Sequence, residues 1–309
     1  MKMITRRRFS RSAAAALMFP TVTGRWPAPI QGVRVGVQTY SFRELRRPPG
    51  GDAVGPIIAA MKTCGLDECE LWSPQIEPAA PAETDRSDPQ ARQATRDTLR
   101  AWRLATPLSH FEGIREKFRA AGLTVYAYNL SFSDSFTDEE IDRGFAQARA
   151  LGTAIITAST TLPVAKRLVP FAARHKIRIA MHNHSRIEDP DEFATPVSFT
   201  TALAMSPYFH VNLDIGHFTA AGFDALQFLQ DHHDRITNLH LKDRKKEQGA
   251  NVAWGEGDTP IRAVLQWLKA RRSPVRAYIE YEYKGREPVE EVKTCLAYAT
   301  RALAGSPGA

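Results

Sequence analysis

The chain has 309 residues, of which 43% are hydrophobic and 24% charged, and its formal net charge is +7. Six basic residues and no acidic residue fall within residues 1–30, so the other 279 residues carry 35 basic and 34 acidic side chains. The excess charge belongs to the N-terminal segment, and the body of the chain has no general electrostatic attraction for nucleic acid or for an anionic membrane.

The first 30 residues have the features of a twin-arginine export signal. The run TRRRFSRSAAAALMFP, residues 5–20, joins consecutive arginines to a short, alanine-rich apolar segment. We expect cleavage between Thr23 and Gln31, delivery to the periplasm, and a single domain over residues 31–309. The alternative is a disordered basic tail. No segment of the sequence is apolar over the ~20 residues that a membrane span needs.

From Val33 onward, short β-branched or apolar runs alternate with helical segments. The strand candidates are residues 33–40, 67–72, 123–130, 153–159, 177–184, 210–216, 236–242 and 276–283. The helix candidates are residues 54–64, 86–105, 110–121, 137–151, 160–175, 221–232, 260–271 and 288–303, with a weaker one over 191–206. Eight such units without a break in composition predict a closed parallel (β/α)8 TIM barrel. The rival, an open doubly wound sheet, usually has a glycine-rich turn after its first strand, and none follows Tyr40.

Ionisable side chains recur at the ends of the last four strand candidates. Active sites of this barrel class lie at the C-terminal ends of the strands, and residues two apart on a strand share a face. The residues in question are His182, His184, Asp214, His217, His240, Lys242, Glu280 and Glu282. Each alone has an ordinary explanation as a rim, turn or surface residue. Together they would be costly to bury without compensation.

A divalent cation would provide that compensation. We expect its ligands to be His182, Asp214, His240 and Glu280, while His184 faces the substrate or supports the ligands. Mixed imidazole and carboxylate ligands suit Mn²⁺, with Zn²⁺, Co²⁺ or Fe²⁺ as alternatives, better than Ca²⁺. Such a site also leaves coordination positions open for substrate oxygens.

At these residues the chain resembles the xylose isomerase-like barrel superfamily, especially bacterial proteins of the sugar phosphate isomerase/epimerase type. The segments LDIGH, HLKD and IEYE are similar to the sixth, seventh and eighth strand signatures of that family. GLDECELW resembles its second-strand glutamate motif, and HNHS resembles the fifth strand of one branch. The likeness covers about residues 33–305.

The resemblance implies a ligand set and a departure from it. In the ketose epimerases of this superfamily, Glu, Asp, His and Glu from strands five to eight hold the metal, and the two glutamates move protons. Asp214, His240 and Glu280 take the last three places. His182 stands where the fifth-strand glutamate is expected, so the second carboxylate base is missing. The resemblance places a substrate-side glutamate near Glu188.

The implied chemistry is metal-assisted enolisation of a keto-sugar. Glu280 is the first candidate for the base, with Glu282 or Glu70 as alternates, and His217 and Lys242 would bind substrate oxygens or deliver a proton. The other expected substrate-side residues are His184, Glu188, Glu70, Tyr40, Phe42, Asn129 and Trp72. The partner is a small carbohydrate, not nucleic acid, and assembly into a homo-oligomer is left open.

Three other functions remain open at this point. A metal-dependent lyase or dehydratase of oxidised (3-keto) sugars or glycosides fits the missing carboxylate. A non-catalytic sugar-binding barrel of the periplasm would need no metal. An apurinic endonuclease-type hydrolase shares the barrel, but it needs more ligands and a basic DNA-binding face.

Overall fold

The computed structural model describes residues 29–46, 52–79 and 87–305. The arginine-rich part of the predicted export signal falls outside the described residues. The export signal and its cleavage therefore stay predictions from the sequence.

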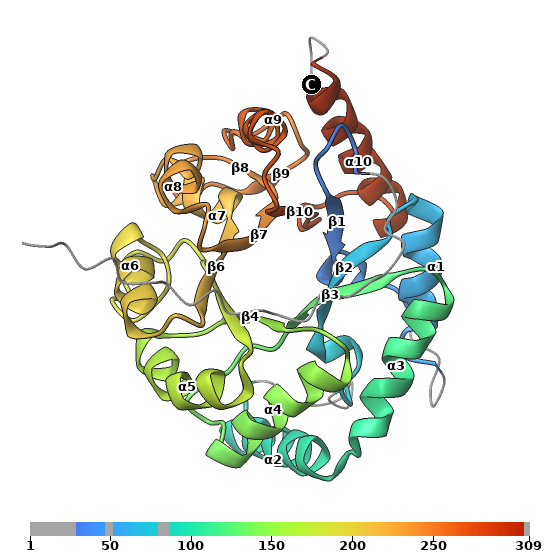
Figure 1. Ribbon diagram of the computed structural model, residues 1–309, viewed down its shortest axis with the longest axis vertical. Helices are drawn as coiled ribbons and strands as arrows, with labels where there is room; N and C mark the ends of the chain where they lie inside the picture. Colours follow the sequence, from blue (N-terminus) through green and yellow to red (C-terminus); the bar gives the residue numbers. More distant parts are fainter. Residues whose placement is uncertain (1–28, 47–51, 80–86, 306–309) are drawn as a thin grey trace, which may run out of the picture.

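Eight parallel strands of the described chain close into a barrel (Figure 1). Each strand pairs with its neighbours in the sequence, and β1 closes the ring against β10. The strands are β1 Val35–Gln38, β2 Glu68–Trp72, β3 Thr124–Asn129, β4 Ile155–Ser159, β5 Arg178–His182, β6 Phe209–Asp214, β7 Ile236–Leu241 and β10 Arg276–Ile279. The predicted (β/α)8 barrel is confirmed.

Helices form an outer ring around the strands (Figure 1). They are α1 Gly55–Cys64, α2 Pro89–Ala105, α3 Leu108–Ala120, α4 Asp138–Ala150, α5 Leu162–His175, α6 Pro196–Met205, α7 Ile215–Ala220, α8 Ala225–His232, α9 Ile261–Arg271 and α10 Pro288–Ala304, with short 3-10 turns η1 Thr39–Phe42 and η2 Ser73–Gln75. The helix predicted over 221–232 starts later, because Asp224 caps α8 by accepting a hydrogen bond from the backbone N–H of Gln227. None of the described helices combines the length and the apolar character of a membrane span.

A short hairpin after β7 is a feature that the sequence pattern does not predict. Its strands, β8 Asp243–Arg244 and β9 Asn251–Val252, pair antiparallel. The buried Asp243 carboxylate accepts hydrogen bonds from the backbone N–H groups of Gly255, Gly257 and Thr259. A Cβ atom on Gly257 would lie 2.0 Å from Asp243 Oδ1, so this turn requires glycine. The hairpin fixes the backbone position of Arg244, whose side chain reaches the open end of the barrel.

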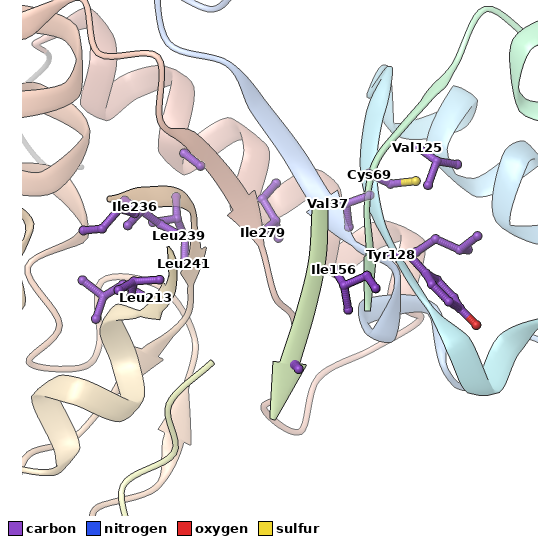
Figure 2. Packing of buried hydrophobic residues seen from close by; sticks show 14 of the residues in the cluster. Val37, Cys69, Val125, Tyr128, Ile156, Leu213, Ile236, Leu239, Leu241 and Ile279 are labelled. Atoms are coloured by element: carbon purple, nitrogen blue, oxygen red, sulfur yellow. The ribbon is translucent and has the colours of Figure 1, made fainter. Parts of the chain in front are cut away.

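Successive side chains of a strand point to opposite faces. One face of the barrel strands is therefore mainly apolar, and the other, which faces the barrel axis, carries polar residues. One face packs against the helices and forms the large apolar core, which includes Val37, Ile156 and Leu213 (Figure 2). Buried polar residues such as Gln38 and Glu70 alternate with these on the same strands and face the barrel axis. Buried polar groups are stable only when they are paired, so the floor of the site is a hydrogen-bond network.

Candidate metal centre and active site

The C-terminal ends of β5, β6 and β7 bring His182, Asp214 and His240 together. One potential ligand atom from each residue lies within 4.8 Å of the other two. Asp214 is the register partner of His240, and all three residues are buried. The structure therefore brings together three of the four residues that the sequence pattern suggests as ligands.

Glu280 lies at the edge of this group. Strand β10 ends at Ile279, one residue before Glu280, so the carboxylate belongs to the loop above the strand. Glu280 Oε2 lies 3.4 Å from His240 Nδ1, and the residue is 7% exposed. Glu280 is therefore within reach of both the histidine and the open end of the barrel.

The atoms of these residues that face one another are buried. His182 Nδ1 has no hydrogen-bond or ion-pair partner among the described residues. Asp214 Oδ2 and Glu280 Oε2 are paired with the Lys242 ammonium, and Glu280 Oε2 also lies near His240 Nδ1. Buried polar atoms in proteins are nearly always paired or bound to an ion. Two imidazole nitrogens and two carboxylate oxygens form a donor set suited to Mn²⁺, Fe²⁺, Co²⁺ or Zn²⁺. The residues present thus fit a divalent cation.

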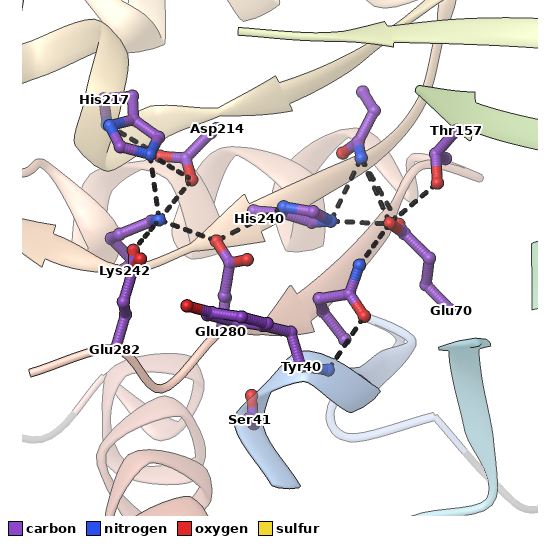
Figure 3. A network of polar contacts seen from close by, with 12 residues as sticks. Tyr40, Ser41, Glu70, Thr157, Asp214, His217, His240, Lys242, Glu280 and Glu282 are labelled. Carbon is purple, nitrogen blue, oxygen red and sulfur yellow. Dashed lines mark hydrogen bonds and ion pairs between the residues drawn. The ribbon is translucent and has the colours of Figure 1, made fainter. Parts of the chain in front are cut away.

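A buried lysine lies beside the same carboxylates (Figure 3). Lys242 Nζ is 3.1 Å from Asp214 Oδ2, 2.8 Å from Glu280 Oε2 and 2.6 Å from Glu282 Oε2. Burial would lower the pKa of Lys242, but these carboxylates raise it above its usual value, so the side chain is an ammonium. Burial raises the pKa of Asp214 to about 7, and the opposing attraction of Lys242 only limits this rise. For Glu280, Lys242 and His240 outweigh burial and hold the pKa well below its usual value.

Glu70 is the centre of a hydrogen-bond network inside the barrel (Figure 3). Its carboxylate accepts hydrogen bonds from side chains of β1, β3, β4, β6 and β7, namely Gln38, Asn129, Thr157, Asn212, Asn238 and His240. Glu70 is 0% exposed. Glu70 and Asn129 belong to the floor of the site, where their polar groups bond to protein. Their contact with a substrate stays a prediction.

Glu70 sets the orientation of His240. Glu70 Oε2 accepts a hydrogen bond from His240 Nε2 at 2.9 Å, which leaves Nδ1 on the side of Glu280. Burial would lower the pKa of His240, but the carboxylates of Glu70 and Glu280 raise it well above its usual value. Metal-binding histidines commonly donate their other ring N–H to a carboxylate. This contact makes Nδ1 the nitrogen available to a cation.

His217 stands beside Lys242 as a neutral imidazole. Its backbone N–H donates to Asp214 Oδ1 at 2.7 Å, which fixes the start of α7. Its Nε2 is 3.1 Å from Lys242 Nζ, and Arg244 donates to its Nδ1 at 2.6 Å. Burial and the adjacent Lys242 lower the pKa of His217 well below its usual value. Arg244, which also donates to Ser185 Oγ, is a site residue that the sequence pattern does not reveal.

His184 is supported by Glu192. His184 Nδ1 donates to Glu192 Oε1 at 2.6 Å, and Glu192 also accepts a hydrogen bond from Arg186. Glu188 is exposed in the same loop. Glu192 reaches His184 because the loop turns back at the bridge between Thr161 and Glu192. A contact of Glu188 with a substrate stays a prediction.

A second histidine group lies beside the first. Potential ligand atoms of His182, His184 and His217 are also within 4.8 Å of one another. Lys242 and Arg244 both contact His217, so two positive charges border this group. This second group has no carboxylate, whereas the first contains Asp214 and has Glu280 beside it, so we take His182, Asp214 and His240 as the candidate metal centre.

Aromatic residues border the site on the side of β1 and β2. Tyr40 and Trp72 are half-buried and pack edge to face, with ring centroids 4.9 Å apart. Tyr40 lies next to Glu280 (Figure 3). Both stay candidates for shaping a substrate pocket. Phe42 is 1% exposed and belongs to the apolar core, so its expected pocket role is wrong.

The fold and the strand-end residues define a (β/α)8 barrel with a candidate metal centre at the carboxyl ends of its strands. The family model described as xylose isomerase-like TIM barrel matches residues 58–300. The chain belongs to this family.

Several solved structures share this fold over most of this chain and nearly the whole of their own. The probable 3-DHS dehydratase AsbF from Bacillus anthracis is 15% identical, with a TM-score of 0.60 over 88% of this chain and 99% of that one. A sugar phosphate isomerase/epimerase from Parabacteroides distasonis is 17% identical, with a TM-score of 0.57 over 87% and 96%. The IolI protein with a bound zinc atom is 14% identical, with a TM-score of 0.57 over 87% and 98%. At these identities the likeness is one of fold. No curated protein sequence matches the chain.

Proposed function

We propose that the protein is a metal-dependent isomerase or epimerase that enolises a keto-sugar. The observation that carries the proposal is the convergence of buried ligand atoms of His182, Asp214 and His240 beside the Glu280–Lys242 pair. A bound divalent cation supplies Lewis-acid polarisation of a carbonyl and its neighbouring hydroxyl, which acidifies the C–H between them. One solved structure with this fold is named as a sugar phosphate isomerase/epimerase and another as a protein with a bound zinc atom. Both names agree with the proposed class. Mn²⁺ is the proposed metal, with Zn²⁺, Co²⁺ and Fe²⁺ as alternatives.

The residues around the centre suit the handling of a proton. Glu280 is ionised at neutral pH because Lys242 and His240 lower its pKa, so its carboxylate can accept a proton from carbon. Lys242 connects Glu280 to Glu282, whose side chain is 27% exposed. If the Lys242 ammonium donates a proton to Glu282 and takes one from Glu280, the proton can reach water through Glu282. Both ring nitrogens of the neutral His217 contact Lys242 and Arg244, so His217 would bind a substrate oxygen only in place of one of these contacts.

A lyase or dehydratase acting on an oxidised sugar is the second candidate. The observation that favours it is His182 on β5, at the position where the ketose epimerases that the sequence resembles have a carboxylate. An imidazole on β5 replaces the second carboxylate base that those epimerases use. One base suffices for proton removal followed by loss of a leaving group, whereas epimerisation needs proton delivery to the opposite face.

The test is deuterium uptake from D₂O into a panel of ketohexoses and 3-keto-glycosides by Mn²⁺-loaded protein. We expect uptake into at least one compound, and a loss of about 10²–10⁴-fold in Glu280→Gln, as for removal of a general base. Glu287→Gln, an exposed glutamate seven residues later, is the matched control and should leave the rate unchanged.

The products separate the candidates. A rearranged sugar supports the isomerase or epimerase, and an unsaturated or cleaved product supports the lyase. Tight saccharide binding with no uptake in the metal-loaded protein would refute both and leave a sugar-binding barrel.

We also propose, from the sequence of residues 1–30 alone, that the protein is exported to the periplasm and that residues 31–309 form the mature domain. Cell fractionation of the full chain and of an Arg7→Lys/Arg8→Lys variant tests this. Retention of both proteins in the cytoplasm would refute it.

A further inference from the structure

His184 is an accessible imidazole beside the metal centre to which the proposed chemistry gives no step. Potential ligand atoms of His184 lie within 4.8 Å of those of His182 and His217, and its ring is 5.2 Å from each of their rings. The candidate ligands are buried, whereas the His184 side chain is 41% exposed. Its ring is therefore open to a molecule that binds at the metal centre.

The backbone around His184 is held from two directions. The side-chain amide of Asn183 accepts a hydrogen bond from the backbone N–H of Asp214 at 2.9 Å and donates to the backbone carbonyl of Asp214 at 3.1 Å. The backbone N–H of His184 donates to the carbonyl of Phe193 at 3.1 Å. The chain is thus joined to the end of β6 just before His184 and to its own loop at His184, which keeps the imidazole in a defined place, as a catalytic group requires.

Glu192 determines which ring nitrogen of His184 is free. Its Oε1 accepts a hydrogen bond from His184 Nδ1 at 2.6 Å, and its Oε2 is bonded to Arg186. Because a carboxylate can only accept, Nδ1 carries the ring proton and Nε2 is left to take up or release another. Glu192 is only 6% exposed, so this contact is well fixed. A carboxylate that orients an imidazole in this way is typical of an acid–base pair.

His184 and Glu280 approach the centre from different sides of the barrel. In the closed barrel β6 and β7 separate β5 from β10 in one direction, and β1 to β4 separate them in the other. His184 follows β5 and Glu280 follows β10. His217 is a poorer candidate for a second proton-transfer group, because its ring nitrogens already contact Lys242 and Arg244.

We propose that His184, positioned by Glu192, is a second catalytic residue that transfers a proton on the face of the sugar opposite Glu280. The inference rests on the proposed function and narrows it to an epimerase. Glu280 takes the proton from the carbon beside the carbonyl, and the C–H electron pair enters the enediolate. Nε2–H of the His184 imidazolium then gives its proton to the same carbon from the other face, and an enediolate electron pair forms the new C–H bond. Glu280 ends protonated and His184 neutral, and proton exchange with water restores both.

The test follows deuterium from D₂O into the panel of ketohexoses and 3-keto-glycosides on Mn²⁺-loaded protein. NMR measures two products separately, namely the starting sugar with deuterium beside the carbonyl and its epimer, and the parent should form both. In His184→Gln, epimer formation should fall about 10²–10⁴-fold, as for loss of a general acid, while exchange into one epimer stays within roughly threefold, because Glu280 still removes and returns a proton on its own face. Glu192→Gln should slow epimer formation about tenfold and leave that exchange unchanged.

Metal content and stability distinguish this role from a structural one. His184 is exposed and is not a proposed ligand, so His184→Gln should keep the metal content of the parent by elemental analysis and its Tm. His233→Gln, which changes an exposed histidine at the end of α8, is the matched control and should alter neither product. Loss of metal in His184→Gln, an equal loss of exchange and epimer formation, or unchanged epimer formation overturns the inference.

The behaviour of the parent separates this inference from the proposed function. Deuterium uptake by the parent without any epimer overturns the inference and leaves enolisation standing. No uptake into any compound refutes the proposed function, and the inference falls with it.

Discussion

Replacing Lys242 with methionine should separate the stability of the chain from its affinity for metal. The ammonium lies 3.1 Å from Asp214 Oδ2 and 2.8 Å from Glu280 Oε2, and both oxygens belong to the candidate metal centre. Without a cation, Lys242→Met leaves buried carboxylates unpaired, which typically costs about 3–5 kcal/mol. At about 2 °C per kcal/mol for a chain of this size, Tm should fall by roughly 6–10 °C.

The same substitution should strengthen metal binding. Lys242 competes with a divalent cation for the two carboxylate oxygens and repels it, so its removal should tighten Mn²⁺ and Zn²⁺ binding at least tenfold, or about 1.4 kcal/mol. Calorimetry gives the affinity, and thermal unfolding with and without metal gives the shift in Tm. The metal-induced rise in Tm should be larger in the variant than in the parent.

Lys246→Met is the matched control, because Lys246 is exposed four residues later in the same segment. It should change neither Tm nor metal affinity. Metal affinity in Lys242→Met equal to or weaker than that of the parent would refute the reasoning, since Asp214 and Glu280 would then not be the residues that a cation contacts.

Two further predictions concern the floor of the site and the base of the barrel. Glu70→Gln removes the carboxylate that orients His240, so metal affinity should fall about 10–100-fold by calorimetry; unchanged affinity would show that Nδ1 of His240 needs no such support. His210 has a pKa lowered to about 4, chiefly by burial, so the unfolded chain binds a proton between about pH 6.5 and 4 that the folded chain does not. The stability that His210 contributes is therefore complete above pH 6.5 and is lost as the pH falls toward 4. His210→Gln should reduce this loss by at most roughly 3 kcal/mol in urea unfolding at pH 7 and pH 4.5, and an identical pH dependence in both proteins would contradict it.

The architecture could be predicted from the sequence because it depends on local alternation. Each buried strand is a short apolar run next to a helical segment. This pattern can be recognised without knowing which strands lie next to one another. The strand ends at His182, Asp214 and His240 could be identified for the same reason: they interrupt apolar runs at one end of each strand, and parallel strands in a barrel bring the same ends together.

The rest of the site depends on contacts between distant strands. Glu70 follows the same alternation as the ligands, yet its donors come from five other strands, and only the stagger of the closed barrel places them around one carboxylate. Glu192 and Arg244 were missed because a loop and a hairpin, which have no periodic pattern, determine where their side chains reach. The resemblance pointed to Glu188, and it could not show which glutamate of the loop reaches His184, because the path of the loop decides that.

The most direct test of the metal centre is elemental analysis of the purified protein after loading with Mn²⁺ and desalting. The parent chain and Asp231→Ala, which removes an exposed carboxylate on α8, should retain about one equivalent of metal per chain. Asp214→Asn and His240→Gln, which keep similar shapes but remove a ligand, should retain almost none. Full retention of metal in both ligand variants would contradict the account, because a cation would then be held elsewhere than at the ends of β6 and β7.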